Sequence, residues 1–290
     1  MCIRDSDDKF GVDYSPPVIF EGNRPCAWAG PLAEAAIKGE KETTALRGLL
    51  GEAVEIGPPS TLELSRDAGR NVLLITPPQA RGPVIASTVS AFAKSHPKLE
   101  VVYFDGTRAD DAPSLAPWFD DVGLNVKTVK LRDCESEIAR LSKLIKDRGD
   151  DSTKASPVVV VIDPLDRFRD LRQDDSFNFS LDSAAADESA PAALQSVLRD
   201  GPAANVFVFL VCAGAETLSR WLPRASQHDL ELRILGRMNA SDSSTLIDSP
   251  VAAELSAATM LVYDDSDGRI VKFRQCDLPN ADAVRRWLAR

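Results

Sequence analysis

Uninterrupted apolar runs restrict the fold of this chain more than any other feature of its sequence. The run at 158–162, Val-Val-Val-Val-Ile, is the clearest of them. Such a run indicates a strand buried on both faces, because a strand with one wet face would alternate apolar and polar side chains. Helical segments separate the earlier runs, and this alternation predicts an α/β fold in which helices cover a mostly parallel sheet. The expected strands span 71–75, 100–104, 126–131, 157–162, 206–211, 230–235, 259–263 and 270–273, and the expected helices span 84–95, 135–147, 192–199 and 280–288.

Length, charge and cysteine spacing narrow the class of protein. A chain of 290 residues suffices for one large α/β domain with an appendage. It carries 34 basic and 44 acidic residues, a net charge of −10, which argues against a module that coats nucleic acid. The sequence has no signal peptide and no apolar stretch near the ~20 residues of a membrane span, so we expect no direct membrane contact. Its 5 cysteines are dispersed without C-x-x-C spacing, which favours a reducing, cytoplasmic location.

The chain divides into three expected parts. Residues 1–6, MCIRDS, resemble translated library adapter and are interpreted as a non-native leader, with a genuine disordered start as the alternative. Residues 7–60 hold too few apolar side chains for a domain of their own, so we expect an adaptor segment packed on the core. Residues 61–290 form the main domain, with a mobile Asp-, Ser- and Ala-rich loop at 173–190. The adapter-like start also predicts that the natural protein continues upstream.

The turn after the apolar run at 72–75 stands where a nucleotide-binding fold has its phosphate cradle. A working cradle reads G-x-x-x-x-G-K-[ST], because glycine N–H groups, an ammonium and a hydroxyl together hold the phosphates and Mg²⁺. If Thr76 is aligned with the first Gly of this motif, Gly82 stands at the Lys position. If Gly82 is aligned with the second Gly, a proline stands there. Three prolines each remove an N–H donor from this turn: Pro77, Pro78 and Pro83. The turn therefore predicts the scaffold of an ATPase without a working phosphate site.

The run at 157–162 ends in an acidic residue, Asp163. In nucleotide-hydrolysing enzymes an Asp at this place orders the water shell of Mg²⁺, and a neighbouring Glu activates the attacking water. Pro164 stands where that Glu would be, so Asp163 is either a Mg²⁺ ligand or the cap of the turn after a buried strand. A rival hypothesis keeps the site active, with Asp163 on Mg²⁺ and Arg81 gripping phosphate in place of the missing Lys. The candidate residues of this degenerate nucleotide site are Thr76, Arg81, Gly82 and Asp163.

A segment of mixed charge follows Asp163. In it, Arg167 and Arg169 alternate with acidic residues. The segment is interpreted either as an interface with a neighbouring subunit or domain, or as a solvated surface helix whose charges pair among themselves. No metal-ligand spacing and no nucleophile motif supports another chemistry, because His96 and His228 are far apart and no G-x-S-x-G elbow exists.

A second polar segment follows the expected strand at 230–235. Arg237 is a candidate contact with a phosphate or a neighbouring subunit. Asp242 is a further interface candidate, although the pair Ser241-Asp242 equally predicts the N-cap of a helix over 243–246. From this segment alone we favour the cap.

The order of these segments resembles the FtsK/SpoIIIE-type motor domain of the HerA–FtsK ATPases, from about Pro16 to the end of the chain. The most specific match is ELRILGRMNASDSSTLIDSP, which resembles the late R-I-A-F-x-V-x-x-x-x-D-S-x-x-I-L-D segment of that family. In this match Asp242 and Ser243 align with the D-S pair and Asp248 with the final Asp, while Asp163 aligns with the Walker B Asp. Other matching segments are PPVIFEGNRP, LLGEAVEIGPP, VVYFDGTRAD, PVVVVIDPLDRFRD and LRDGPAANVFVFLVCAG.

The resemblance implies a RecA-like P-loop NTPase core with helices on both faces of the sheet and a closing β-hairpin over 259–273. It implies ATP and Mg²⁺ as the family's cofactors, a ring homo-oligomer, and ATP-driven translocation of double-stranded DNA or secreted protein. Because the Walker A Lys and the catalytic Glu have no counterpart here, we expect a degenerate module that holds ATP weakly or not at all. We expect this module at the C-terminus of a larger translocase, where it assembles with or regulates a competent upstream ATPase domain.

Overall fold

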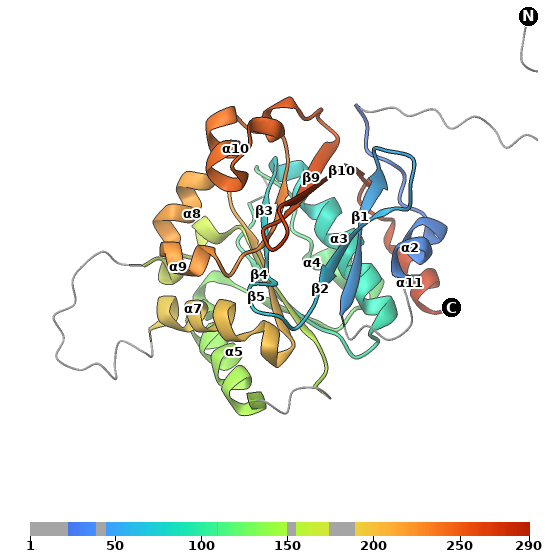
Figure 1. The fold of residues 1–290 in the computed structure, drawn as a ribbon. Coiled ribbons are helices and arrows are strands. Elements are labelled where there is room, and N and C mark those ends of the chain that lie inside the picture. Colours follow the sequence, from blue (N-terminus) through green and yellow to red (C-terminus); the bar gives the residue numbers. More distant parts are fainter. Residues whose placement is uncertain (1–22, 39–44, 109, 150–154, 174–188) are drawn as a thin grey trace, which may run out of the picture.

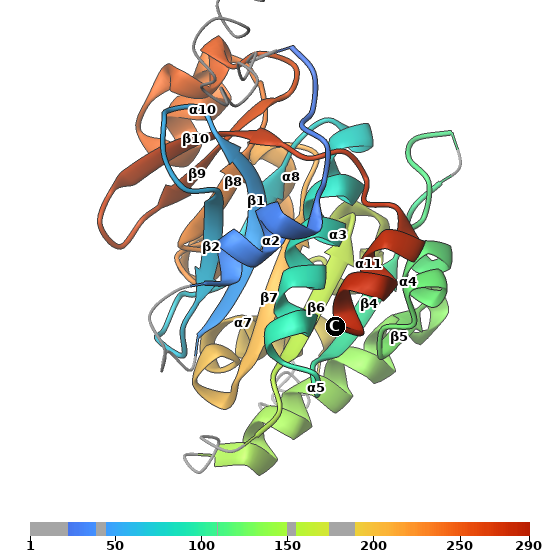
Figure 2. The same cartoon turned by 90° about the vertical axis from the view of Figure 1, so that its right-hand side faces the viewer.

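The computed structural model describes residues 23–38, 45–108, 110–149, 155–173 and 189–290. One central sheet runs through the molecule, with helices on both of its sides (Figure 1, Figure 2). The expected leader at 1–6 lies outside the described residues, as does nearly all of the expected loop at 173–190. None of the described helices combines the length and apolar character needed to cross a lipid bilayer.

The sheet has ten strands in the order β2-β1-β10-β9-β8-β3-β7-β6-β4-β5. Neighbours from β8 to β5 pair in parallel, whereas the pairs from β2 to β8 are antiparallel. The α/β class, the mostly parallel central sheet and the C-terminal hairpin of β9 and β10 are therefore confirmed. The strands are β1 Leu46–Ala53, β2 Ser60–Leu64, β3 Val72–Ile75, β4 Glu100–Asp105, β5 Val126–Val129, β6 Val158–Asp163, β7 Val206–Val211, β8 Leu232–Leu235, β9 Thr259–Asp264 and β10 Arg269–Gln275.

Both faces of the parallel strands are apolar, as the uninterrupted runs predicted. In β3, Leu73 and Ile75 belong to one buried core, and Val72 and Leu74 belong to the other, because successive side chains of a strand point to opposite faces. The core that contains Leu73 is covered by α5 Cys134–Arg148, α7 Ala190–Asp200, α8 Ala215–Trp221 and α10 Ala240–Ile247. The opposite core is covered by α3 Pro78–Ser95, α4 Ala116–Val122 and α11 Ala281–Leu288.

Short elements complete the layers around the sheet. The helix α2 Gly30–Ile37 packs beside α3 and α11, and α9 Arg224–Gln227 packs beside α7. The expected helix at 280–288 corresponds to α11, whose first turn is capped by the Asn280 side chain accepting from the N–H of Ala283. The 3₁₀ turns of the described residues span Leu131–Asp133, Leu165–Arg167, Arg169–Leu171, Pro202–Ala204 and Pro250–Glu254.

The segment before residue 61 takes part in the same sheet as the rest of the chain. β1 pairs with β10 on one side and with β2 on the other. Gly48 allows β1 to lie close to α3, because a Cβ at this position would be 2.4 Å from Cγ2 of Thr88. β2 begins at Ser60 and is missing from the sequence prediction, since the polar Thr61 and Glu63 break its apolar pattern.

Candidate functional site

A cavity of about 440 Å³ opens at the carboxyl ends of β3, β6, β7 and β8. Ligands of open α/β sheets bind at this edge, in the crevice outside the strand ends. The structure brings four of the predicted site residues to the cavity wall: Thr76, Arg81, Arg167 and Arg237. Gly82 lies within α3, where a Cβ would face Leu115. The predicted residues therefore come together only in part.

The connection between β3 and α3 consists of Thr76 and Pro77 alone. The helix begins at Pro78, six residues before the expected start at 84, and includes Pro83. The expected start was wrong because proline is compatible with the first turn of a helix, where Pro78 stands, and because α3 also accommodates Pro83 in its interior. Two residues cannot wrap a phosphate in glycine N–H groups as a cradle does. The hydroxyl of Thr76 is buried and has no hydrogen-bond partner among the described residues.

Arg81 and Asp163 form a buried ion pair below the cavity. Nε of Arg81 lies 3.0 Å from Oδ1 of Asp163, and Nη2 of Arg81 lies 3.1 Å from Oδ2 of Asp111. Arg81 is 5% exposed and Asp163 is 1% exposed. The hydroxyl of Tyr103 donates to Oδ2 of Asp163 at 3.1 Å. Both carboxylate oxygens of Asp163, and two of the three guanidinium nitrogens of Arg81, therefore already lie close to groups of the chain itself, although Nε and Oδ1 meet as charges and not in hydrogen-bond geometry.

Burial dominates the electrostatics of this pair. It raises the pKa of Asp163 to about 6, although the positive charge of Arg81 opposes the shift. Burial also raises the pKa of Tyr103, and the neighbouring charge of Asp163 adds to that effect. Arg81 is thus the principal group that keeps a carboxylate ionised at a position almost without solvent.

The connection after β4, described at 106–108 and 110–114, supplies cavity residues that the sequence prediction missed. Arg108 and Asp111 both line the cavity. The loop is held by Asp105 at the end of β4, whose carboxylate accepts from Thr107 Oγ1 at 2.6 Å and Lys130 Nζ at 2.7 Å. Burial disfavours the Asp105 carboxylate, but these hydrogen bonds outweigh burial and lower its pKa. The parallel pairing of β4 with β6 indicates that the residues after β4 lie near those after β6, since the carboxyl ends of the two strands share one edge of the sheet.

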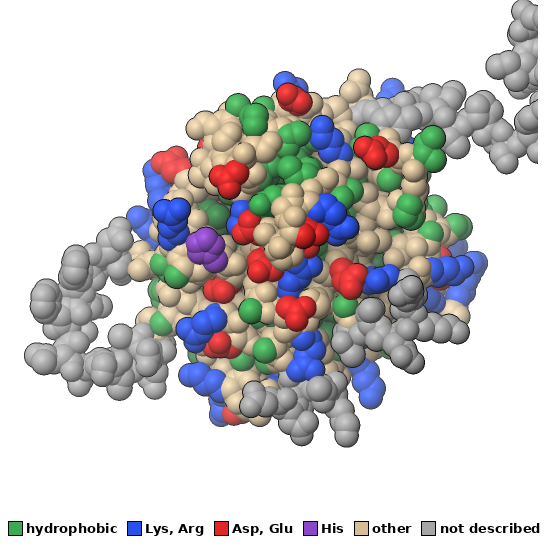
Figure 3. Space-filling model, in the orientation of Figure 1, with side chains coloured by type: hydrophobic (Ala, Val, Ile, Leu, Met, Phe, Trp, Pro, Cys, Tyr) green, Lys and Arg blue, Asp and Glu red, His purple; other side chains and the backbone are tan. Residues whose placement is uncertain are grey.

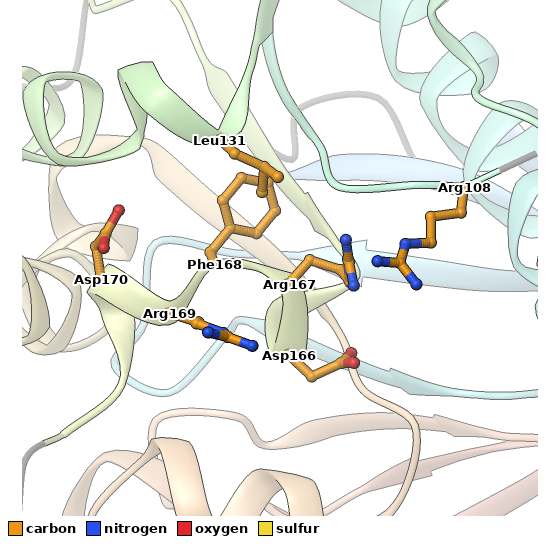
Figure 4. A pocket seen from close by; sticks show the side chains of 7 residues that line it. All are labelled: Arg108, Leu131, Asp166, Arg167, Phe168, Arg169 and Asp170. Carbon is orange, nitrogen blue, oxygen red and sulfur yellow. The ribbon is translucent and has the colours of Figure 1, made fainter.

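A second cavity, of about 290 Å³, adjoins the first and shares Arg108, Asp166 and Arg167 with it (Figure 4). Arg169 and Asp170 complete its polar wall. The mixed-charge segment is not a surface helix but a pair of 3₁₀ turns. Among the residues that the structure describes, no ion pair joins its arginines to its acids. Asp174 and Asp175, the last acids of the segment, lie outside the described residues, so both interpretations of its charges stay predictions.

Arg237 reaches the first cavity, whereas Asp242 is part of a helix cap. The helix α10 begins at Ala240, and its cap is Asn239 rather than the predicted Ser241-Asp242 pair. Oδ1 of Asn239 accepts from the N–H of Asp242 at 2.8 Å, and Nδ2 of Asn239 donates to the Asp242 carboxylate at 2.8 Å. The prediction erred by two residues because Asn, Ser and Asp all suit a cap, and the sequence contains all three between positions 239 and 242.

Replacement of Asn239 by Ala should cost about 1 kcal/mol of unfolding free energy, because it leaves first-turn N–H groups of α10 without their acceptor. Urea denaturation followed by circular dichroism measures this loss. The matched control is Ser241→Ala, which should change stability by less than about 0.5 kcal/mol. Equal losses in the two variants would contradict the cap seen here.

Comparisons with known proteins give a fold but no close relative. No protein-family model matches the sequence, and no curated protein matches it either. Among solved structures, the pCW3 conjugation coupling protein TcpA, in its monomer form with ATPγS, superposes with a TM-score of 0.66 at 11% identity. That match covers 90% of this chain and 73% of TcpA.

Two further ATPase structures are also similar to this chain. The cytoplasmic domain of the type VII secretion ATPase EccC from Thermomonospora curvata gives a TM-score of 0.60 at 15% identity, over 88% of this chain and 32% of EccC. ATPases 2 and 3 of EssC from Geobacillus thermodenitrificans give 0.58 at 12% identity, over 95% of this chain and 52% of EssC. The chain thus spans a third to a half of these two structures. It has the fold of TcpA-type coupling proteins and EccC/EssC ATPase domains, which confirms the FtsK/SpoIIIE-like, RecA-like architecture.

Proposed function

We propose that this chain is a catalytically degenerate FtsK/SpoIIIE-like ATPase module. The observation that carries the proposal is the buried Arg81–Asp163 ion pair. It stands at the strand end where an active relative would hold Mg²⁺ and phosphates. An internal guanidinium supplies the positive charge that a metal ion would otherwise bring to the carboxylate.

The residues of this cavity do not fit ATP and Mg²⁺ held in the usual way. A triphosphate is held by several charge-assisted hydrogen bonds worth ~1.5–3 kcal/mol each, from loop N–H groups and a Lys. The two-residue turn Thr76-Pro77 cannot form that loop, and Pro164 cannot act as the general base. Loss of these contacts supports weak or absent nucleotide binding.

The proposed setting is a larger ATP-driven translocase with DNA or protein as its cargo. Tandem ATPases 2 and 3 occur in EssC, and this chain covers 52% of that structure, which supports one module among several. In this proposal residues 7–60 are an adaptor, and Arg167, Arg169, Arg237 and Asp242 face an upstream competent motor domain or a neighbouring subunit of a cytoplasmic ring.

The cargo is assigned to the whole assembly rather than to this module. The net charge of the chain is −10. On the face shown in Figure 3, acidic and basic side chains are interspersed, without a broad area of basic charge. Binding of double-stranded DNA by the module alone would need such an area. The module therefore acts in this proposal on assembly or regulation of the motor.

Calorimetric titration with ATP and Mg²⁺ tests the proposal. We expect no binding heat with the nucleotide at concentrations up to about 1 mM. A dissociation constant of about 1 mM corresponds to a binding free energy of only ~4 kcal/mol. Micromolar binding, or hydrolysis above background, would defeat the proposal. The variant Arg81→Ala distinguishes this proposal from the rival hypothesis of an active site. The rival hypothesis predicts that the wild-type protein binds ATP and that Arg81→Ala abolishes this binding.

A further inference from the structure

Two arginine side chains converge where the two cavities meet. Arg108 comes from the loop after β4, and Arg167 comes from the 3₁₀ turn after β6. Figure 4 shows their guanidinium groups directed toward one another. Gly106 brings the two connections together, because a Cβ there would lie 2.8 Å from Cβ of Arg167. The N–H of Gly106 also donates to the carbonyl oxygen of Asp163 at 2.8 Å. The two backbone segments that carry these arginines are therefore held side by side.

Within the described part of the chain, no acidic side chain forms an ion pair with either of these two like charges. Across the described ranges, neither the Arg108 nor the Arg167 guanidinium takes part in an ion pair or a side-chain hydrogen bond. Nε of Arg167 is buried and has no partner there. A buried donor without an acceptor is unfavourable, and so is the approach of two guanidinium groups. An oxyanion placed between the two guanidinium groups would accept from the buried donor and would reduce their repulsion, because each group offers a planar fork of N–H donors.

We propose that this site binds the carboxylate of an acidic side chain on a protein partner. The wall of the second cavity carries three positive charges, from Arg108, Arg167 and Arg169, and two negative charges, from Asp166 and Asp170. The sum is 3 − 2 = +1, which one carboxylate neutralises. A phosphate dianion would exceed that charge and would be repelled by the two aspartates. The charge balance of the site therefore favours a single carboxylate.

The apolar part of the wall indicates what accompanies the acidic residue. Leu131 is 40% exposed at the cavity, although it is a large apolar side chain. Phe168 is buried and packs edge-on against Phe104 of β4, with 5.7 Å between ring centroids, so it forms a rigid floor. An acidic residue followed by an apolar one would place its carboxylate between the arginines and its neighbour on Leu131. The choice of a protein as the partner rests on the proposed function, in which this module packs against another domain or subunit.

Nuclear magnetic resonance of the arginine Nε–Hε groups tests the site directly. The probes are a capped Glu-Leu dipeptide, a capped Gln-Leu dipeptide and inorganic phosphate, each titrated into the full chain. We expect the Glu-Leu probe to shift the signals of Arg108 and Arg167 saturably. The Gln-Leu probe should bind about tenfold more weakly or not at all, since it lacks charge-assisted hydrogen bonds. Phosphate should bind no more tightly than Glu-Leu.

Variants separate this site from general surface charge. Arg167→Lys keeps the charge but loses the fork, and should weaken Glu-Leu binding by about tenfold. Arg108→Lys, on the exposed loop, should do the same, so the test survives if the Arg167 variant folds poorly. Arg132→Lys is the control, because that side chain is 86% exposed. Non-saturating shifts equal to those of Arg132, or tighter binding of phosphate than of Glu-Leu, would overturn the inference. Neither outcome depends on whether the protein binds ATP.

Discussion

Replacing Arg81 by Met should lower the free energy of unfolding by about 3–5 kcal/mol, the range for removing one partner of a buried ion pair. The variant keeps an apolar stem in the same space but leaves the Asp163 carboxylate, 1% exposed, without its cation. Of the residues that the structure describes, only Tyr103 would remain to donate a hydrogen bond to it. Urea unfolding at pH 7, followed by tryptophan fluorescence, gives the difference from the wild-type protein.

Asp163→Asn and the double variant complete a mutant cycle for this pair. In the double variant neither a buried charge at position 163 nor a cation at position 81 remains, so its cost should be smaller than the sum of the two single costs. We expect a coupling energy of at least about 1 kcal/mol, within the range for residues in contact. Additivity to within about 0.5 kcal/mol would show that the pair does not act as a unit.

Acid should stabilise the protein through Asp163. Its pKa rises from 3.8 to about 6 on folding, because burial penalises the charged form. The folded state then binds more protons than the unfolded state between about pH 4 and pH 6. This contribution is fully present below about pH 4 and is lost as the pH rises through 6. The shift of about 2 units corresponds to roughly 3 kcal/mol, at 1.36 kcal/mol per unit.

The difference in unfolding free energy between the wild-type protein and Asp163→Asn isolates this effect, because Asn cannot titrate. That difference should change by roughly 2.5 kcal/mol in favour of the wild-type protein as the pH falls from 7 to 4. Asp105→Asn is a control for which the pH effect has the opposite sign. The pKa of Asp105 is lowered on folding, so the contribution of Asp105 to the free energy of unfolding is lost on acidification. A pH-independent difference for Asp163→Asn would contradict a raised pKa.

The sequence predicts most of the sheet because its strands are buried on both faces. The run at 158–162 leaves no other arrangement for so many consecutive apolar residues, and β6 matches it closely. Edge elements carry a weaker signal, so β2 was missed. The start of α3 was placed too late because three prolines resemble a loop in sequence. Pro78 is tolerated because N–H groups of the first helical turn have no acceptor, whereas Pro83 lies inside the helix.

The site could be predicted only in part. Strand ends locate Asp163, Arg167 and Arg237 at one edge, and the missing Lys and Glu can be read directly from the sequence. The pairing of Arg81 with Asp163 could not be read, because 82 positions separate them and it depends on where the first turn of α3 points. Arg108 and Asp111 lie on a loop whose path is fixed by hydrogen bonds to Asp105, which no periodic pattern records.

A crystal structure grown with Mg²⁺ and a non-hydrolysable ATP analogue tests the central claim most directly. The claim is that an internal ion pair replaces the bound nucleotide of an active relative. We expect Arg81 to remain paired with Asp163 and no analogue to be bound along residues 76–84. An analogue seated there, with Arg81 turned from Asp163 toward its phosphates, would contradict the account.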